Sequence, residues 1–90
     1  MKKLSDIVSK NGFTYRMLQR TEKKALYAQY YQNTLIGFEV FLIRIRGAQF
    51  SYILNKTLPP AERFPGNEDF GRTAWSIQKY EDAIIRFNKL

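Results

Sequence analysis

The sequence predicts an α+β domain: an antiparallel meander of three or four strands with a C-terminal helix packed on one face. From residue 13 the side-chain types alternate with a period of two, which is typical of strands. From residue 77 apolar side chains recur at spacings of three, four and three, which is typical of an amphipathic helix. The 90 residues, 44% hydrophobic and 16% aromatic, are enough for one small domain with its own core.

Residues 1–12 are expected to form a basic segment that precedes a single α+β domain over residues 13–90. Leu4, Ile7 and Val8 lie at helical spacing, and Asn11-Gly12 supplies a stop signal. This pattern predicts a short N-terminal helix.

Four stretches that follow have the composition of strands. The third is rich in β-branched and aromatic residues and ends at Gly47. The second and third are joined by Gln32-Asn33-Thr34, a connection of hairpin length. The predicted strands are residues 13–18, 25–32 and 35–46, with a short fourth strand at residues 50–54.

The last third of the chain reads as a loop and then a helix. Residues 58–71 hold all three prolines and two glycines, so we expect a loop there. Ser76 is a candidate N-cap. The helix that follows carries one apolar stripe, made of Ile77, Tyr80, Ile84 and Phe87.

Both faces of the predicted sheet are apolar, although antiparallel sheets usually expose one polar face. If the turn pairs Tyr31 with Leu35, the face that takes the helix carries the pairs Tyr30–Ile36, Ala28–Phe38 and Leu26–Val40. The opposite face then carries Glu39 together with Tyr15, Met17, Tyr27, Tyr31, Phe41, Ile43 and Ile45.

Two explanations for the second apolar face stay open. Either it docks a partner or a second copy of the chain, or the long loop folds across it. The loop side chains that would cover it are Phe50, Tyr52, Phe64, Phe70 and Trp75.

The composition argues against catalysis. The chain has no His and no Cys, and therefore no imidazole or thiol for acid–base, nucleophilic or zinc chemistry. It also lacks a glycine-rich phosphate loop. Two adjacent carboxylate pairs remain: Glu81-Asp82, which do not face each other on a helix, and Glu68-Asp69, which either form a turn or hold a metal. We expect no enzyme, no cofactor and no metal site.

The formal net charge of +7 indicates an anionic partner, and the charge is unevenly distributed. Residues 1–56 hold ten Lys and Arg against three Asp and Glu, whereas residues 57–90 hold five of each. We expect a basic patch on the meander, where arginines suit phosphate oxygens and tyrosines stack on unpaired bases. The alternatives are a solubilising strand edge for the cations and core packing for the tyrosines. The candidate binding residues are Arg16, Arg20, Lys23, Lys24, Arg44, Arg46, Tyr27 and Tyr31.

Three stretches carry a resemblance to known proteins: residues 37–46 (GFEVFLIRIR), 64–71 (FPGNEDFG) and 84–90 (IIRFNKL). Over residues 13–90 the chain resembles small proteins of phages and mobile elements of Bacteroidetes-type bacteria. That group has no established activity to carry over to any residue. The resemblance implies a context in which small basic proteins act by binding, including inhibitors of host defence such as anti-CRISPR proteins.

The expected function is non-enzymatic binding of RNA, DNA or a nucleoprotein complex, with RNA favoured over DNA. Its most specific form is a phage-type inhibitor of an RNA-guided nuclease. The alternative is a structural or adaptor protein that self-associates as a homo-oligomer, or binds another protein, through its sheet face or edge. Because the chain has no signal peptide and no apolar run near the roughly 18 residues of a membrane span, we expect a soluble cytoplasmic protein with no membrane partner. If phages encode it, that is the host cytoplasm.

Overall fold

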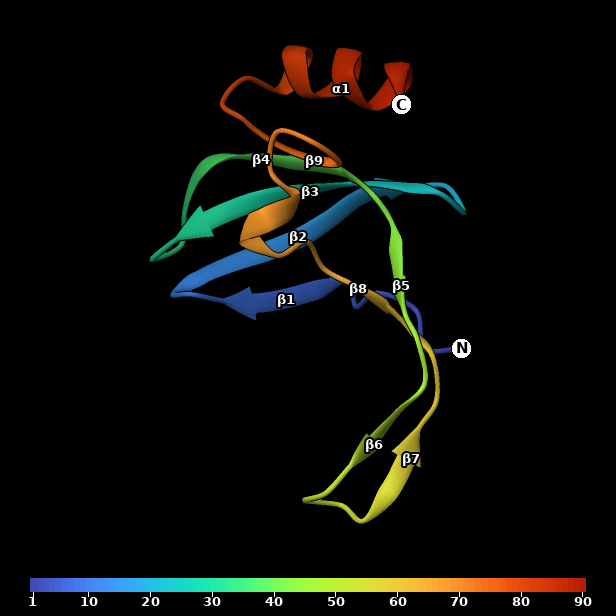
Figure 1. The fold of residues 1–90 in the computed structure, drawn as a ribbon. Helices are drawn as coiled ribbons and strands as arrows, with labels where there is room; N and C mark the ends of the chain where they lie inside the picture. The colour runs from blue at the N-terminus through green and yellow to red at the C-terminus, as the bar shows by residue number, and fades with distance from the viewer.

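The computed structural model, which describes residues 1–90, confirms the α+β class. Five antiparallel strands form one sheet in the order β1-β2-β3-β4-β9, and the helix α1 packs across one of its faces (Figure 1). The elements of this body are β1 (Ile7–Lys10), β2 (Phe13–Arg20), β3 (Lys24–Tyr31), β4 (Thr34–Leu42), β9 (Ala74–Ile77) and α1 (Tyr80–Lys89).

Two further strand pairs and a short 3-10 helix lie outside the main sheet. The elements are β5 (Arg44–Arg46) with β8 (Ala61–Arg63), β6 (Gln49–Ser51) with β7 (Lys56–Leu58), and η1 (Asn67–Asp69). The β5–β8 pair lies on the side of the sheet opposite α1, and the β6–β7 hairpin continues from it away from the body (Figure 1). No helix of the protein is long and apolar enough to cross a membrane.

The N-terminal segment is a strand, and the short helix predicted there is wrong. Asn11 and Gly12 have φ values of 55° and 84°, and positive φ at both positions is typical of the two-residue hairpin turn that Asn-Gly favours. This turn folds β1 back onto β2, where the β-branched Ile7 and Val8 fit the pleated sheet. Residues 7–10 therefore form an edge strand of the main sheet.

The register of the β3–β4 hairpin agrees with the prediction in the middle of the strands. Next to the turn it is shifted by one residue. The predicted pairs that β3 and β4 do form are Ala28–Phe38 and Leu26–Val40. The turn itself has two residues, Gln32 and Asn33, both at positive φ. The shifted pairs beside the turn are Tyr31–Thr34 and Tyr30–Leu35, and a bulge beyond them restores the register.

The strand predicted over residues 35–46 is two strands, because the chain leaves the sheet after Leu42. Its second half, β5, pairs with β8 and not with β3. The strand predicted at residues 50–54 is part of the β6–β7 hairpin. The fifth strand of the main sheet is β9, a strand that the sequence did not predict; only its last residue, Ile77, belongs to the predicted helical stripe. As a result Ile77 lies in β9, α1 begins at Tyr80, and its N-cap is Lys79 instead of Ser76.

One core lies between the sheet and α1. Leu26, Ala28, Phe38 and Val40 of the sheet contact Ala83 and Phe87 of the helix, and all six are buried. The predicted helical stripe is confirmed at Phe87 and at Ile84, which is partly buried against this core. Tyr80 is half exposed and meets the ring of Phe38 edge-on, with ring centroids 5.6 Å apart.

A second core lies on the opposite face and settles how that face is covered. Its buried members are Tyr15, Ala25, Tyr27, Phe41 and Ala74. Of the five loop side chains predicted to cover it, Phe64 does so: its ring lies 4.8, 5.2 and 5.1 Å from those of Tyr15, Tyr27 and Phe41. The other four do not join this core. Val8 and Leu4 from the N-terminal segment complete the cover.

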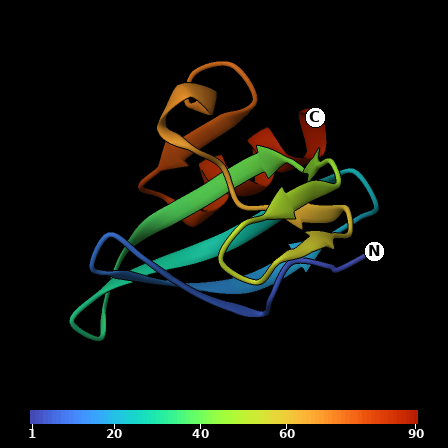
Figure 2. The same cartoon turned by 60° about the horizontal axis from the view of Figure 1, so that its bottom comes forward.

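The molecule is elongated by its β6–β7 hairpin, which we call the arm. Its extents are 44 × 30 × 21 Å and its radius of gyration is 14.0 Å, whereas a compact chain of this length has about 12 Å. Figure 1 shows the arm extending away from the body, and in Figure 2, turned so that the bottom of Figure 1 comes forward, the arm lies in front of the sheet. The strands of the arm pair with each other and with no strand of the body.

Candidate nucleic-acid interface

Arg20, one of the predicted binding residues, is held in an ion pair inside the protein. Its Nη1 and Nη2 donate to the two carboxylate oxygens of Glu62 at 2.7 and 2.9 Å. The Glu62 side chain is 2% exposed, and the hydrogen bonds from Arg20, with a further one from the Leu4 N–H, lower its pKa to about 2. Because both arms of the guanidinium are engaged, Arg20 ties β2 to β8 and does not offer its fork to a partner.

Lys24 and Arg46 donate to backbone carbonyl groups of the protein. Lys24 Nζ lies 2.7 Å from the carbonyl oxygen of Phe87 and 3.3 Å from that of Leu90, where it satisfies the C-terminal end of α1. Arg46 donates to the carbonyl oxygens of Gly47 and Pro59, each at 3.0 Å, and so fastens the base of the arm. Both cations contribute to the field of the protein while they hold local structure.

Arg16 and Lys23 are exposed, but the structure does not bring Arg16 and Arg44 into one patch. Arg16 lies opposite Ala28 on the helix side of the sheet. Arg44 belongs to β5, which lies on the other side (Figure 1). The single basic patch predicted for the meander is therefore divided.

Tyr27 is fully buried, which corrects its prediction as a binding residue. Its ring packs against Phe41 and Phe64, and its hydroxyl donates to the carbonyl oxygen of Ser5 at 2.7 Å. Burial raises the pKa of that hydroxyl to about 12. Tyr31, at the end of the sheet, is about half exposed and packs against Phe13 with ring centroids 5.6 Å apart.

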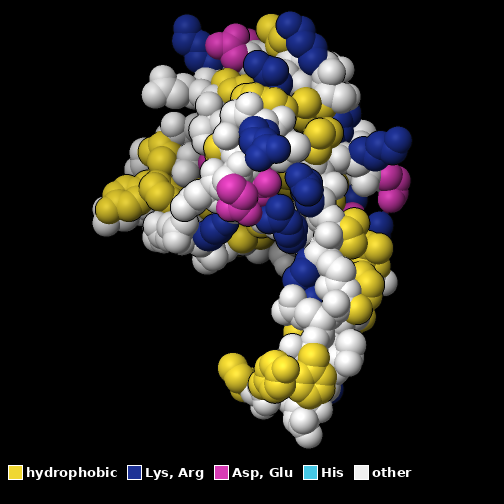
Figure 3. Space-filling model, in the orientation of Figure 1, with side chains coloured by type: hydrophobic (Ala, Val, Ile, Leu, Met, Phe, Trp, Pro, Cys, Tyr) yellow, Lys and Arg dark blue, Asp and Glu magenta, His cyan; other side chains and the backbone are white.

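Arg44 lines an open polar pocket, and two arginines from later in the chain line it as well. The pocket has a volume of about 310 Å³ and no apolar side chain in its wall. The lining residues are Arg44, Arg63, Glu68, Asp69, Arg72 and Thr73. The β5–β8 register places Arg44 directly opposite Arg63. We call this the arginine pocket; dark-blue and magenta side chains gather over the middle of the molecule in Figure 3.

Asp69 builds the turn that brings Arg72 to the arginine pocket. Its carboxylate accepts a hydrogen bond from the Gly66 N–H at 2.9 Å and lies 3.1 Å from Arg63 Nη2. The bond from Gly66 above all, with the charge of Arg63, lowers the pKa of Asp69. Its backbone carbonyl accepts the N–H groups of Arg72 and Thr73 at 3.0 and 2.9 Å. The turn chemistry considered for Glu68-Asp69 is therefore present at Asp69, and no three acidic side chains gather into a group that could hold a metal ion.

Two of the three guanidinium groups at the arginine pocket have no partner. Arg63 pairs with Asp69 and lies 3.8 Å from Glu68. Arg44 and Arg72 are exposed and take part in no ion pair of the protein. Like charges directly opposite on paired strands repel, and an anion between them removes that repulsion. Because guanidinium groups match the geometry of phosphate oxygens, the pocket can hold a phosphate.

Sequence reasoning finds Arg44 but misses Arg63, Arg72 and Thr73. No family model, curated protein or solved structure matches this chain. The three missed residues lie within residues 57–90, where five cations balance five anions and no excess of positive charge marks a site. The balanced charge of residues 57–90 is misleading, because Glu62 pairs with Arg20, which lies outside that segment. Arg72 is therefore left without an ion-pair partner.

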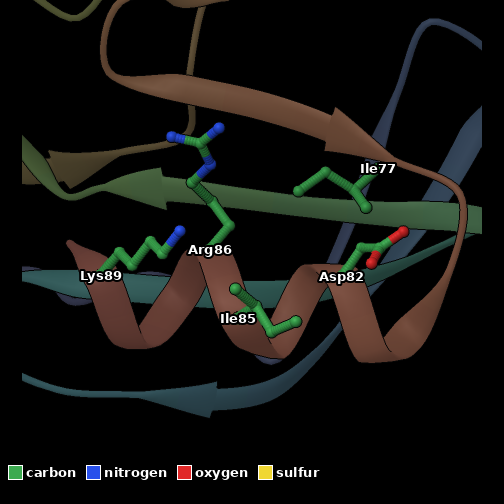
Figure 4. Close-up of a pocket in the computed structure, with 5 residues that line it drawn as sticks. All are labelled: Ile77, Asp82, Ile85, Arg86 and Lys89. Carbon is green, nitrogen blue, oxygen red and sulfur yellow. The ribbon is translucent and has the colours of Figure 1, made fainter.

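A second hollow lies between α1 and β9 (Figure 4). It has a volume of about 210 Å³ and is lined by Ile77, Asp82, Ile85, Arg86 and Lys89. Arg86 rises from the helix toward β9 in Figure 4, and its guanidinium carbon lies 4.8 Å from the centre of the Trp75 ring. Because isoleucines and charges of both signs share this wall, the hollow favours no single ligand chemistry.

Proposed function

We propose that this chain is a non-enzymatic binding protein that holds a phosphate group of an RNA strand in the arginine pocket. The observation that carries the proposal is the set of three guanidinium groups around one polar pocket, with two of them unpaired. RNA within a nucleoprotein complex, such as an RNA-guided nuclease, presents the same phosphates as free RNA. The proposal therefore covers both kinds of target.

The rest of the molecule supports a polyanion over a small anion. The net charge is +7, and Lys2 and Lys23 are exposed around the sheet. Such charges raise the rate of encounter with a polyanion and release counterions on binding. Single-stranded regions are favoured over duplex, because their phosphates and bases can both reach a small pocket.

The test is the salt dependence of RNA binding, measured by fluorescence anisotropy with a single-stranded RNA of about 16 nucleotides. The double variant R44Q/R72Q removes two unpaired cations from the arginine pocket. Two lost phosphate contacts lower the slope of log K against log salt by about 1.4 for a single strand. We expect that change and a loss of affinity of about tenfold or more at low salt.

The matched control is R16Q/K79Q, which removes the same charge from exposed positions elsewhere. We expect it to change affinity much less than R44Q/R72Q does. Equal losses for the two double variants would mean that general charge, and not the pocket, binds RNA. If wild type binds no RNA and instead forms a salt-insensitive oligomer in light scattering, the adaptor alternative is favoured, with β1 and β9 as the two edge strands of the sheet.

A further inference from the structure

The end of the arm is the most exposed apolar surface of the protein. The four-residue turn between β6 and β7 begins Tyr52-Ile53-Leu54, and these side chains are 88%, 95% and 57% exposed. Phe50, on β6 below the turn, is also exposed and meets Tyr52 edge-to-face, with ring centroids 4.9 Å apart. Figure 3 shows these apolar groups together at the far end of the arm.

The fold does not need these side chains. The arm strands pair with each other alone, and neither Phe50 nor the turn residues belong to either core. Water contact with three large apolar side chains is unfavourable, at roughly 25 cal/mol for each Å² of apolar surface. Exposed apolar groups gathered at one point of a monomer mark a binding surface.

The charges along the arm match a polyanion. From Val40 to Ala61 the chain has no Asp or Glu, but it has Arg44, Arg46 and Lys56. Arg44 lies at the arginine pocket, Arg46 at the base of the arm, and Lys56 on β7 just after the turn. The cations thus lead from the proposed phosphate site toward an apolar tip that carries no charge.

We infer that the tip of the arm stacks on the bases of the RNA whose phosphate the arginine pocket holds, with Tyr52 as the stacking ring. This inference rests on the proposed function and extends it from the backbone to the bases. Aromatic and aliphatic side chains displayed beside cations are the usual means of holding unpaired bases without reading their sequence. Because Tyr52 is 88% exposed, a face of its ring is open to a base.

The structure favours bases over a lipid bilayer as the occupant. The tip is an irregular turn with Asn55 at a φ of 52°, and the Leu54 N–H is bonded to Ser51 Oγ at 3.2 Å. Irregular backbone of this kind is not exposed to hydrocarbon, where its polar groups find no partner. Stacked bases, in contrast, offer an apolar surface within a hydrated strand.

The spacing of the two sites sets the length of RNA that can use both. Tyr52 lies eight positions after Arg44 along the chain, which is at most about 26 Å of extended backbone. At about 3.4 Å per nucleotide for a fully stacked strand, eight nucleotides span that distance, and an extended single strand needs fewer. A 16-nucleotide probe is long enough to reach both sites.

The experiment compares two probes of equal length: a single-stranded RNA, and an abasic oligonucleotide that keeps every phosphate but has no bases. Two variants separate ring stacking from apolar burial, because Tyr52→Leu keeps the apolar side chain without the ring and Tyr52→Trp keeps a ring. We expect Y52L to lose about tenfold in affinity for RNA and to bind the abasic probe as wild type does. We expect Y52W to retain wild-type affinity for RNA.

Three results would overturn the inference. If Y52L binds RNA as tightly as wild type while R44Q/R72Q fails to bind, the pocket holds RNA and the tip does not. If Y52L weakens both probes equally, the tip contributes no base stacking. If wild type binds phosphatidylserine vesicles and the double variant Y52S/I53S loses that binding but keeps its RNA affinity, the tip inserts into membranes instead. The proposed function is tested separately by R44Q/R72Q: it fails if this variant binds RNA as tightly as wild type, whatever Y52L does.

Discussion

The carboxyl group of Glu39 lies inside the protein, on the face of the sheet opposite α1. It is 3% exposed and accepts hydrogen bonds from Ser76 Oγ at 3.1 and 3.2 Å. Burial raises its pKa to about 7, and Ser76 and the charge of Lys10 only partly oppose that rise. An ionised carboxylate at this position is therefore unfavourable.

The folded protein should lose stability as pH rises from about 4.5 to about 7. In that range Glu39 stays protonated when folded but ionises when unfolded, so the unfolded state is favoured by up to about 3 kcal/mol at pH 7. Below pH 4.5 Glu62 acts in the opposite sense. Its pKa is about 2 in the folded protein, so the stability that its ionised form contributes is lost as pH falls from about 4.5 toward 2. Stability is expected to be greatest near pH 5.

Urea unfolding of wild type and E39Q at pH 5 and pH 8 checks this expectation. The Gln amide oxygen can still accept from Ser76, but the side chain does not titrate. E39Q should show much the same free energy of unfolding at both values, while wild type loses stability at pH 8. Equal stability of wild type at the two values would contradict the assignment of a raised pKa to Glu39.

Single residues were the hardest feature to predict from the sequence. Arg20, Lys24 and Arg44 look alike as cations on a basic meander. Their roles depend on Glu62, on the carbonyl groups that end α1, and on Arg63, which lie 42, 63 and 19 positions further along the chain. No local spacing encodes such distant pairings, so only Arg44 of these three is open to a partner.

At the scale of elements, Phe64 is the one aromatic residue between β8 and β9 that covers the second face of the sheet. It packs against Tyr15, Tyr27 and Phe41, and its replacement by Ala leaves a cavity among three rings. We expect F64A to lower the free energy of unfolding by about 3 kcal/mol. F50A is the matched control, because it removes the same ring from the exposed arm and should change stability by less than about 0.5 kcal/mol.

Chemical denaturation of the two variants measures both values. Similar losses for F64A and F50A would mean that the arm stabilises the body as much as Phe64 does. A small loss for F64A alone would mean that the second face tolerates water, which would restore it as a docking surface.

The elements that local chemistry specifies were predictable, and those set by distant pairing were not. The alternation in β2 and the apolar stripe of α1 arise from burial on one face, and the apolar run of β3 arises from burial on both faces, so these elements could be predicted. Asn11-Gly12 is a strong hairpin signal, but the spacing of Leu4, Ile7 and Val8 also fits a helix, and Asn-Gly also ends helices. The start of the helix was misplaced because Ile77 fits the stripe by spacing and yet pairs with Phe38 as a strand residue.

At the scale of the whole molecule, a compact body carries a separable arm. The two cores lie on the two faces of the sheet, and neither includes a residue between Gly47 and Pro60. The cations behind the net charge of +7 therefore have two roles. Some hold the body together, while those at the arginine pocket and on the arm are exposed to solvent. A sequence-level charge sum cannot separate these two uses.

Replacement of residues 47–60 by Asn-Gly tests this division directly. The two-residue turn joins β5 to β8, whose register is unchanged, and a shorter loop costs less entropy to close. We expect the free energy of unfolding to change by less than about 1 kcal/mol, and the radius of gyration from X-ray scattering to fall from 14.0 Å toward about 12 Å.

The armless protein should bind the intact and the abasic probes equally, since it keeps the arginine pocket but has no ring for a base. An armless protein that fails to fold would show that the arm stabilises the body, and one that still prefers the intact probe would place the base contacts elsewhere.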